Sequence, residues 1–379
     1  MKIVYCIAGT YRSGGMERVL ANKANYFSNL GHEVTIVTTD QRGQKPFFQH
    51  HPSISHVDLD INYEENNGKS FFNKLRHYPS KQRLHRMRLE NLLINIKADL
   101  VVSMFCNDVS FITKINDGSK KVLEIHFSKW KRLQYGRKGL WYLADWFQTK
   151  LDERRVARFD RFVVLTREDK GYWGDLPNIV VIPNSISSFP EKVSSLEHKE
   201  VIAIGRYTYQ KGFDRLLKIW RKVVNQEPSW RLNIVGDGEL RPQLASQVEK
   251  LSLQNHVTLS FPTNEIEKIY LNSSILALTS RYEGLPMILI EAQSYGLPIV
   301  SYTCQCGPKD VITDGKDGYL VDEGDEEGFV QRLLELMKDT EKRKDFGKVA
   351  RESSQRFDNE AIMSQWLDLF SSLHSENQA

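Results

Sequence analysis

The sequence predicts an α/β fold with two parallel, doubly wound domains in tandem. Short apolar runs of strand length alternate with helical patterns along nearly the whole chain, which is typical of parallel sheets covered by helices. The 379 residues are too many for one ordinary core and suit about two domains. A polar, Ser-rich stretch at residues 185–200 separates one series of strands and helices from a second, and we interpret it as a linker.

The first series begins with a buried strand and a helix. Apolar residues recur at helical spacing from Met16 to Leu30, and Gly31 ends this helix before the next strand. A basic segment at residues 69–88 is expected to lead into a helix that ends near Ile96. The strands expected in this half are residues 2–8, 33–39, 54–61, 99–104, 121–125 and 161–165, and Val180-Val-Ile-Pro-Asn184 ends the half.

The second series repeats the alternation after the linker. Its expected strands are residues 201–205, 230–235, 257–261, 275–279 and 298–302. Its expected helices are residues 212–226, 240–251, 286–295, 328–337, 341–351 and 358–373. The last helix has an apolar face, and such a face needs a surface against which it is buried.

Composition limits the class of protein. With 40% hydrophobic and 26% charged residues, the chain has the composition of an ordinary globular protein. Its four cysteines form no metal-ligand pattern, and we interpret Cys304-Gln-Cys306 as reduced thiols. No stretch approaches the roughly 20 apolar residues that cross a membrane, and the first residues resemble a strand more than a signal peptide. The sequence therefore predicts a cytoplasmic protein.

Positive charge is concentrated in the first half. Residues 1–184 contain 29 basic and 19 acidic residues (+10), and residues 185–379 contain 23 and 29 (−6), which together give the net +4. Residues 69–88 carry seven basic and no acidic residues, and residues 127–158 carry nine and three. Aromatic residues are interleaved with these cations, which suits an anionic membrane surface or a pyrophosphate-linked lipid. A solvated face with core aromatics explains the pattern equally well, and no nucleic-acid-binding module is present.

The stretch Arg281-Tyr-Glu-Gly-Leu-Pro-Met-Ile-Leu-Ile-Glu291-Ala carries the strongest signal of a binding site. Pro is favoured at the first position of a helix, so we expect a helix to open at Pro286. Free backbone N–H groups at such a start attract anions. Glu283 lies ahead of the helix and Glu291 inside it, and we interpret these acids as acceptors for hydroxyl groups on either side of an anion. A sugar, a diphosphate and a ribose offer that order of groups.

Two glycine-framed loops add anion-binding features. The strand at residues 201–205 runs into Gly205-Arg206-Tyr-Thr-Tyr-Gln-Lys211-Gly212. Arg and Lys at the carboxyl end of a strand lie where open α/β sheets bind ligands, and both bind phosphate. Gly14 and Gly15 precede the first helix, where glycine lets a ligand approach the backbone closely. Taken singly, each loop is explained as well by solvated cations or by a tight turn.

In their order and spacing these motifs resemble the retaining family 4 glycosyltransferases, which are GT-B proteins with two Rossmann-like domains facing each other across a cleft. The resemblance covers nearly the whole chain and includes Val-Ile-Pro-Asn184, Val235-Gly-Asp-Gly238 and Gly307-Pro308. It implies an acceptor-side domain at residues 1–184, completed by a C-terminal helix at about 358–379 that packs back on it. Residues 185–357 would form the nucleotide-sugar-binding domain.

The resemblance also implies a role for each matching residue. Glu283 would contact the donor hexose, Arg206 and Lys211 would neutralise the donor diphosphate, and Glu291 would hold the ribose. His126 matches a histidine near the sugar and the acceptor, although a lone histidine at a strand end is as often structural. The donor-binding positions are Gly14, Gly15, Gly205, Thr263, Gly284, Leu285, Pro286, Met287 and Glu291. At Phe261-Pro262-Thr263-Asn264 the chain lacks the glycine that many relatives have. The resemblance therefore leaves open whether the base of the donor is uracil or guanine.

The implied activity is retaining transfer of a hexose or N-acetylhexosamine from a nucleotide sugar, expected to be UDP-linked. The acceptor would be a glycan or a polyprenyl-diphosphate-linked lipid in polysaccharide or lipopolysaccharide synthesis, at the inner face of the cytoplasmic membrane. We expect no cofactor and no metal, and we interpret Asp58-Leu-Asp60 as strand residues. Two alternatives stay open: a GT-B nucleotide-sugar epimerase and a non-catalytic nucleotide-sugar-binding subunit.

Overall fold

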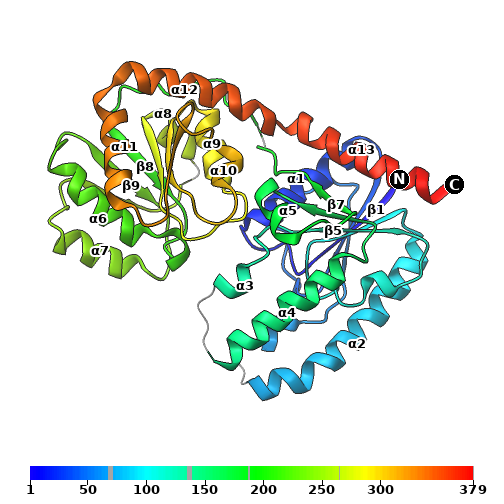
Figure 1. Cartoon of the computed structure of the whole chain (residues 1–379). Coiled ribbons are helices and arrows are strands. Elements are labelled where there is room, and N and C mark those ends of the chain that lie inside the picture. The colour runs from blue at the N-terminus through cyan, green and yellow to red at the C-terminus, as the bar shows by residue number, and fades with distance from the viewer. Residues whose placement is uncertain (67–70, 135–138, 187, 264, 379) are drawn as a thin grey trace. The chain divides into compact units, whose positions relative to one another are not determined.

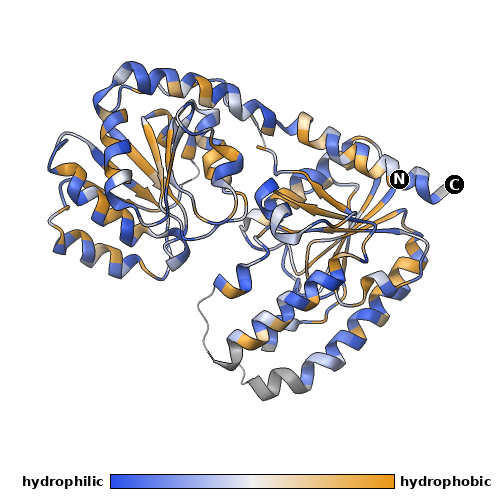
Figure 2. Ribbon diagram, viewed as in Figure 1, coloured by the Kyte–Doolittle hydropathy of each residue, from blue (hydrophilic) through white to orange (hydrophobic). Residues whose placement is uncertain are grey.

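The structure is a computed structural model that describes residues 1–66, 71–134, 139–186, 188–263 and 265–378. The chain forms two compact units, each built on one parallel sheet (Figure 1). Unit 1 comprises residues 1–165, 170–185 and 360–379, and unit 2 comprises residues 166–169 and 186–359. Hydrophobic strands lie at the centre of each unit, and the covering helices have hydrophilic outer faces (Figure 2).

The sheet of unit 1 has the strand order β3-β2-β1-β4-β5-β6-β7. Its strands are β1 (Lys2–Ile7), β2 (Glu33–Thr38), β3 (Ser55–Asp58), β4 (Leu100–Ser103), β5 (Lys120–Glu124), β6 (Arg161–Val164) and β7 (Ile179–Val181). Its longer helices are α1 (Gly15–Asn29), α2 (Phe71–Ile96), α4 (Leu140–Val156) and α13 (Asn359–Gln378). The direction of winding reverses between β1 and β4, so the loops after these two strands lie at the topological switch point.

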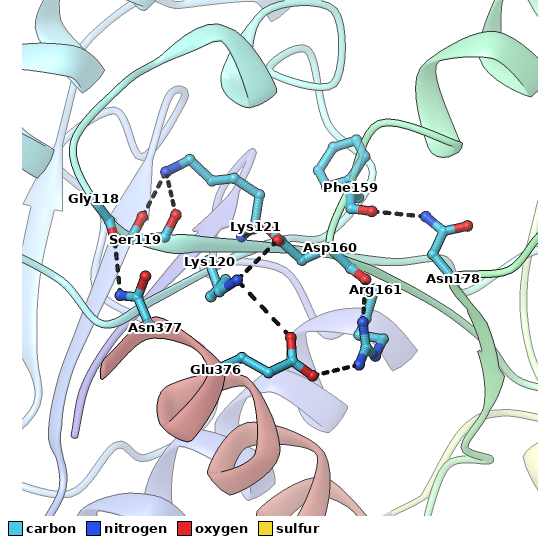
Figure 3. A network of polar contacts seen from close by, with 10 residues as sticks. All are labelled: Gly118, Ser119, Lys120, Lys121, Phe159, Asp160, Arg161, Asn178, Glu376 and Asn377. Carbon is cyan, nitrogen blue, oxygen red and sulfur yellow. Dashed lines mark hydrogen bonds and ion pairs between the residues drawn. The ribbon is translucent and has the colours of Figure 1, made fainter. Parts of the chain in front are cut away.

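The last helix, α13, completes unit 1. Its Trp366 and Phe370 are buried in the same core cluster as Phe27 of α1, and the rings of Phe27 and Phe370 are 5.1 Å apart. Near its end Glu376 lies 2.9 Å from Arg161 and 3.9 Å from Lys120, which are the first residues of the neighbouring strands β6 and β5 (Figure 3). The apolar face predicted for this helix is therefore buried against unit 1.

The sheet of unit 2 has the strand order β10-β9-β8-β11-β12-β13. Its strands are β8 (Glu200–Ile204), β9 (Arg231–Val235), β10 (Val257–Ser260), β11 (Ile275–Leu278), β12 (Ile299–Tyr302) and β13 (Gly318–Val321). Its longer helices are α6 (Phe213–Val224), α7 (Arg241–Lys250), α8 (Ile266–Leu271), α9 (Met287–Ser294), α11 (Glu326–Lys338) and α12 (Thr340–Ser354). Here the winding reverses between β8 and β11, which are neighbours in the sheet.

The structure corrects the expectation for the first basic segment of unit 1. The basic segment does not lead into a helix but forms most of α2, which begins at Phe71 and includes Pro79. A proline costs a helix about 3 kcal/mol, but Lys81 and Arg88 of α2 donate to backbone carbonyls of neighbouring loops and help to hold the helix in place. Residues 69 and 70 of this segment, and residues 135–138 of the second basic segment, lie outside the described residues. In the described part of the chain, no helix combines the length and apolar character that a membrane span needs.

Candidate active site

Two loops of unit 2 meet at the switch point of its sheet. The loop after β8 runs from Gly205 to Gly212, and the loop after β11 runs from Thr279 to Pro286. Because β8 and β11 are parallel neighbours whose connections depart in opposite directions, a crevice for a ligand is expected where their carboxyl ends meet. Seven of the residues predicted from sequence lie on these two loops: Gly205, Arg206, Lys211, Glu283, Gly284, Leu285 and Pro286.

Glycine allows the two loops to touch. Gly212 has a φ of +64°, and a Cβ atom there would lie 2.2 Å from the carbonyl oxygen of Thr279. The Thr279 hydroxyl in turn donates to the Gly212 carbonyl at 3.0 Å, and the Arg281 amide donates to the Gln210 carbonyl at 2.7 Å. A side chain at Gly212 would therefore separate the loops as well as strain the backbone.

An arginine clamp, which sequence reasoning missed, fixes the same junction. The guanidinium of Arg281 donates to both carboxylate oxygens of Asp214, at 2.9 and 2.7 Å, and stacks 3.9 Å from the centre of the Tyr209 ring. Burial would raise the pKa of Asp214, but the hydrogen bonds and charge of Arg281 outweigh it and lower that pKa. No local pattern could reveal a pair separated by 67 residues. The clamp links α6 to the loop that carries Glu283.

Lys211 and Glu283 form an ion pair at the centre of this junction. The Lys211 ammonium lies 2.7 Å from Oε1 of Glu283, whose side chain is 7% exposed. Gln210 supports the loop by donating to the Tyr282 carbonyl at 3.0 Å and, more weakly, to the Glu283 carboxylate at 3.4 Å. Gly205 leaves room for the lysine, because a Cβ atom there would lie 3.0 Å from the Lys211 Cε.

Arg206 lies at the other end of the loop after β8. Its side chain is exposed, and its guanidinium has no ion pair with any residue that the structure describes. The loop thus presents one cation that is already paired and one that faces solvent. A ligand with two adjacent anionic groups would suit this arrangement.

The start of α9 supplies backbone donors beside these cations. The structure corrects the expected helix start: Pro286 is the N-cap, with φ −73° and ψ 96°, and the helix begins at Met287. In the described part of the chain, the amides of Leu285 and Met287 donate to no carbonyl. Gly307 packs against this turn, since a Cβ atom there would lie 2.3 Å from Pro286 Cδ. Free amides at a helix start favour an anion.

Glu291 lies on α9 and is oriented by Tyr270. The Tyr270 hydroxyl donates to Oε2 of Glu291 at 2.9 Å, and the Tyr270 ring stacks on Tyr295 with centroids 4.8 Å apart. The carboxylate is therefore held in one direction while it can still accept further hydrogen bonds. The role of Tyr270 was not predicted, because no sequence motif marks this residue of α8 as a partner of Glu291.

Thr263 follows β10 and has an exposed side chain. Its hydroxyl accepts a hydrogen bond from the amide of Glu265, the residue before α8, at 3.0 Å. The neighbouring Phe261 is exposed, and Arg241 stacks 3.6 Å from its ring centre. Asn264 lies outside the described residues. The loop offers an aromatic surface and a hydroxyl group at the carboxyl edge of the sheet.

Three predicted residues belong to unit 1. Gly14 is the N-cap of α1 and Gly15 its first residue, and a Cβ atom at Gly15 would meet nothing within 4 Å. His126 follows β5, and its side chain is 7% exposed. Because β1 and β5 are parallel, the glycine turn and His126 both lie at the carboxyl edge of the sheet of unit 1.

His126 has charged neighbours that were not foreseen. Its Nε2 lies 3.1 Å from Oε1 of Glu124, although the two atoms are not aligned for a hydrogen bond. The same oxygen is 2.5 Å from the Lys23 ammonium. Burial would raise the pKa of Glu124, but the charges of Lys23 and His126 outweigh it and lower that pKa to about 2.

The described residues contain no group of three or more His, Cys, Asp or Glu side chains that could hold a metal ion. Asp58 ends β3, whereas Asp60 lies beyond the strand with a φ of +49°, so the interpretation of both as strand residues holds for Asp58 alone. None of the four cysteines, all of which the structure describes, forms a disulfide.

The models of two protein families together match most of the chain. Residues 185–353 match the model of the glycosyl transferases group 1, and residues 13–188 match the model of glycosyltransferase family 4. The boundary between the two matches lies in the stretch between β7 and β8.

Two relatives match along nearly their full length. The amylovoran biosynthesis glycosyltransferase AmsD of Erwinia amylovora is 30% identical, over 97% of this chain and 99% of its own. An α-1,4-N-acetyl-D-galactosaminyltransferase of Campylobacter jejuni, whose substrate is a glycan on undecaprenyl diphosphate, is 27% identical over 97% of this chain and 98% of its own.

Solved structures agree with the fold. TarM superposes with a TM-score of 0.80 at 17% identity, covering 97% of this chain and 98% of that one. HepE of Anabaena, in complex with UDP and glucose, superposes with a TM-score of 0.74 at 17% identity, covering 98% of this chain and all of that one. The predicted GT-B class, with two Rossmann-like domains, is confirmed.

Proposed function

The chain belongs to the group 1 glycosyltransferases of family 4, and from this premise we propose that it transfers a hexose or N-acetylhexosamine from a UDP-sugar with retention of configuration. The product would be part of a surface polysaccharide or lipopolysaccharide. The observation that carries the proposal is the Lys211–Glu283 pair, which lies at the switch point of unit 2 next to the start of α9.

The residues of unit 2 offer suitable contacts for each part of a nucleotide sugar, namely the diphosphate, the sugar, the ribose and the base. Arg206 and the amides of Leu285 and Met287 would bind the diphosphate, together with Lys211. Glu283 would accept hydrogen bonds from hydroxyl groups of the sugar. Glu291, which Tyr270 already orients, would accept them from the ribose. Thr263 and Phe261 lie where the base would be held, and the complex of HepE with UDP and glucose supports uracil.

The mechanism follows from where charge develops. When the anomeric bond breaks, the sugar becomes positive and the departing diphosphate becomes more negative. Arg206, Lys211 and the helix-start amides would stabilise that leaving group, which is the task that a divalent metal performs elsewhere. We propose attack on the face that the leaving group occupied, with a phosphate oxygen accepting the proton of the acceptor. This route requires no nucleophile from the protein.

Unit 1 is the proposed acceptor-side domain, where Gly14, Gly15 and His126 keep the roles that the resemblance implies. The Campylobacter relative supports a polyprenyl-diphosphate-linked acceptor. Such an acceptor lies at a membrane, and α4 offers a face for it. The exposed large hydrophobic side chains of α4 are Tyr142, Leu143, Trp146, Phe147 and Leu151. Lys150, Arg154 and Arg158 lie on or just beyond the same helix, so the surface joins apolar and cationic groups as an anionic bilayer requires.

Thermal-shift screening against UDP-, GDP- and ADP-sugars tests the donor, because a ligand that binds the native state raises the melting temperature. A donor that stabilises the wild-type protein should stabilise Glu291→Ala much less. Incubation of UDP-N-acetylglucosamine without acceptor tests the epimerase alternative. Conversion to an epimer under those conditions would contradict transfer as the main activity.

A further inference from the structure

Three ionisable side chains of unit 1 are buried together beneath the carboxyl edge of its sheet. Lys23 comes from α1, Glu124 ends β5, and His126 follows two residues later. The side chains of Lys23 and Glu124 are each 1% exposed and that of His126 is 7% exposed. The Lys23 ammonium also lies 3.4 Å from the centre of the Trp366 ring. Nothing in the motifs of the family resemblance accounts for Lys23 or Glu124.

Stability does not explain such a cluster. Desolvation of two charges often cancels their attraction, so a buried ion pair is weak evidence for a stabilising role. An apolar pair would fill the same space beside Trp366 without that cost. The residues also leave polar atoms unsatisfied: Oε2 of Glu124, both ring nitrogens of His126 and the hydroxyl of the neighbouring Tyr5 are buried and have no hydrogen-bond partner in the described part of the chain. The arrangement therefore points to a task that needs a fixed charge.

The geometry indicates that task. Lys23 keeps Glu124 ionised, since its ammonium is 2.5 Å from Oε1. A carboxylate 3.1 Å from Nε2 of His126 favours a proton on that nitrogen, because its negative charge repels a nitrogen lone pair at this distance and attracts an N–H group even without the alignment of a hydrogen bond. When Nε2 carries the proton in the neutral ring, Nδ1 is the hydrogen-bond acceptor. The other ionisable group of the cluster is Tyr5 on β1, where burial and then the charge of Glu124 raise the pKa of the phenol.

We propose that Glu124, held ionised by Lys23, is a positioning residue that keeps the proton of His126 on Nε2 and leaves Nδ1 as the acceptor. This inference rests on the proposed function only in that His126 takes part in transfer. The effect on the ring itself is independent of any activity.

Selective ¹⁵N-histidine labelling with NMR measures the position of the proton directly, and the His126→Ala spectrum assigns the signal. In the wild-type protein we expect the neutral Nε2–H form. Glu124→Gln should mix the two tautomers. Because Glu124→Gln leaves Lys23 buried without its partner, the pair Lys23→Met/Glu124→Gln is the second variant, and it should give the same mixture of tautomers. An unchanged tautomer in both variants would overturn the proposal.

Asp117→Asn is the matched control. Asp117 forms an ion pair with Lys121, near the end of β5 opposite to Glu124. The side chains of Asp117 and Lys121 are 0% and 6% exposed. The substitution removes a buried negative charge just before β5 and leaves Glu124 unchanged. We expect this variant to keep the His126 signal and the turnover of the wild-type protein.

A double-mutant cycle on transfer separates positioning from a structural role. Glu124→Gln should lower kcat/KM about tenfold in the wild-type background and should have no further effect on His126→Ala. An equal loss in both backgrounds would overturn the proposal, as would full turnover by His126→Ala. If the wild-type protein transferred no sugar, the proposed function would fail while the NMR result still decided the position of the proton.

Discussion

The ammonium group of Lys211 lies 2.7 Å from the carboxylate of Glu283, and this ion pair joins the two loops at the switch point of unit 2. In the absence of a donor, the ammonium of Lys211 and the carboxylate of Glu283 are therefore paired with each other. A diphosphate would compete for Lys211, and a sugar hydroxyl would then donate to Glu283. The pair therefore couples the recognition of the phosphate to the recognition of the sugar.

Variants of this pair should lose turnover. We expect Glu283→Gln and Lys211→Met each to lower kcat/KM about 10²- to 10³-fold, the effect of removing one preorganised charge from such a site. The double variant should lose less than the product of the two, since each single change leaves an unpaired group behind. Glu327→Gln is the control, because Glu327 forms an exposed pair with Lys222 at 2.6 Å. Wild-type turnover in Glu283→Gln would refute the site.

The arginine clamp should matter for donor binding. Arg281→Lys keeps the charge but loses the planar fork that binds both oxygens of Asp214 and stacks on Tyr209. We expect the KM for the donor to rise about tenfold, which corresponds to about 1.4 kcal/mol. Arg332→Lys is a matched control in unit 2, because Arg332 pairs with Glu335 at 2.9 Å and lies 4.4 Å from the Tyr319 ring. An equal effect of both variants would show that the clamp has no special role.

The stability of unit 1 should depend on pH through Asp108. Burial raises the pKa of Asp108 to about 6, although a hydrogen bond from Ser103 acts in the opposite direction. A raised carboxyl pKa stabilises the fold below the unfolded value of about 3.9, and this contribution disappears as the pH rises through 6. The advantage of wild-type protein over Asp108→Asn should therefore fall by about 2 kcal/mol between pH 4 and pH 7. Urea denaturation measures it, and a difference that does not vary with pH would contradict this assignment.

Transfer should continue in excess chelator. The proposed site stabilises the leaving diphosphate with Arg206, Lys211 and backbone amides, so removal of divalent ions should leave the rate within about twofold of the untreated enzyme. Loss of activity in chelator, followed by rescue with Mn²⁺ or Mg²⁺, would overturn the metal-independent mechanism. Parallel assays with and without added Mg²⁺ exclude an effect of the chelator itself.

Vesicle co-sedimentation tests the surface of α4. We expect binding to vesicles that contain anionic lipid at low salt, and weaker binding as salt screens the cations. Trp146→Ser/Phe147→Ser should reduce binding at least tenfold, since burial of each ring contributes about 1.5–3 kcal/mol. Phe47→Ser is the control, because Phe47 is 59% exposed elsewhere in unit 1. No binding of the wild-type protein at low salt would remove the membrane proposal.

The sequence predicted most of the fold because the strands are buried on both faces and appear as continuous apolar runs. It missed β13, since Gly318–Val321 is a short edge strand after a turn-rich stretch. Predicting the loops of the site was possible because glycine, proline and charge follow strand ends there. The partners of those residues were not predictable, because Lys23 and Glu124, like Asp214 and Arg281, are far apart in sequence and share no periodic pattern.

The place of α13 has a consequence for biosynthesis. Trp366 and Phe370 belong to the core of unit 1, yet they follow all of unit 2 in the chain. A ribosome therefore releases the first 185 residues long before the helix that covers their apolar face has been made. During that interval part of the core of unit 1 is exposed to solvent, and this apolar surface is available for chaperones to bind. The nascent chain can close unit 1 only after all of unit 2 has been synthesised.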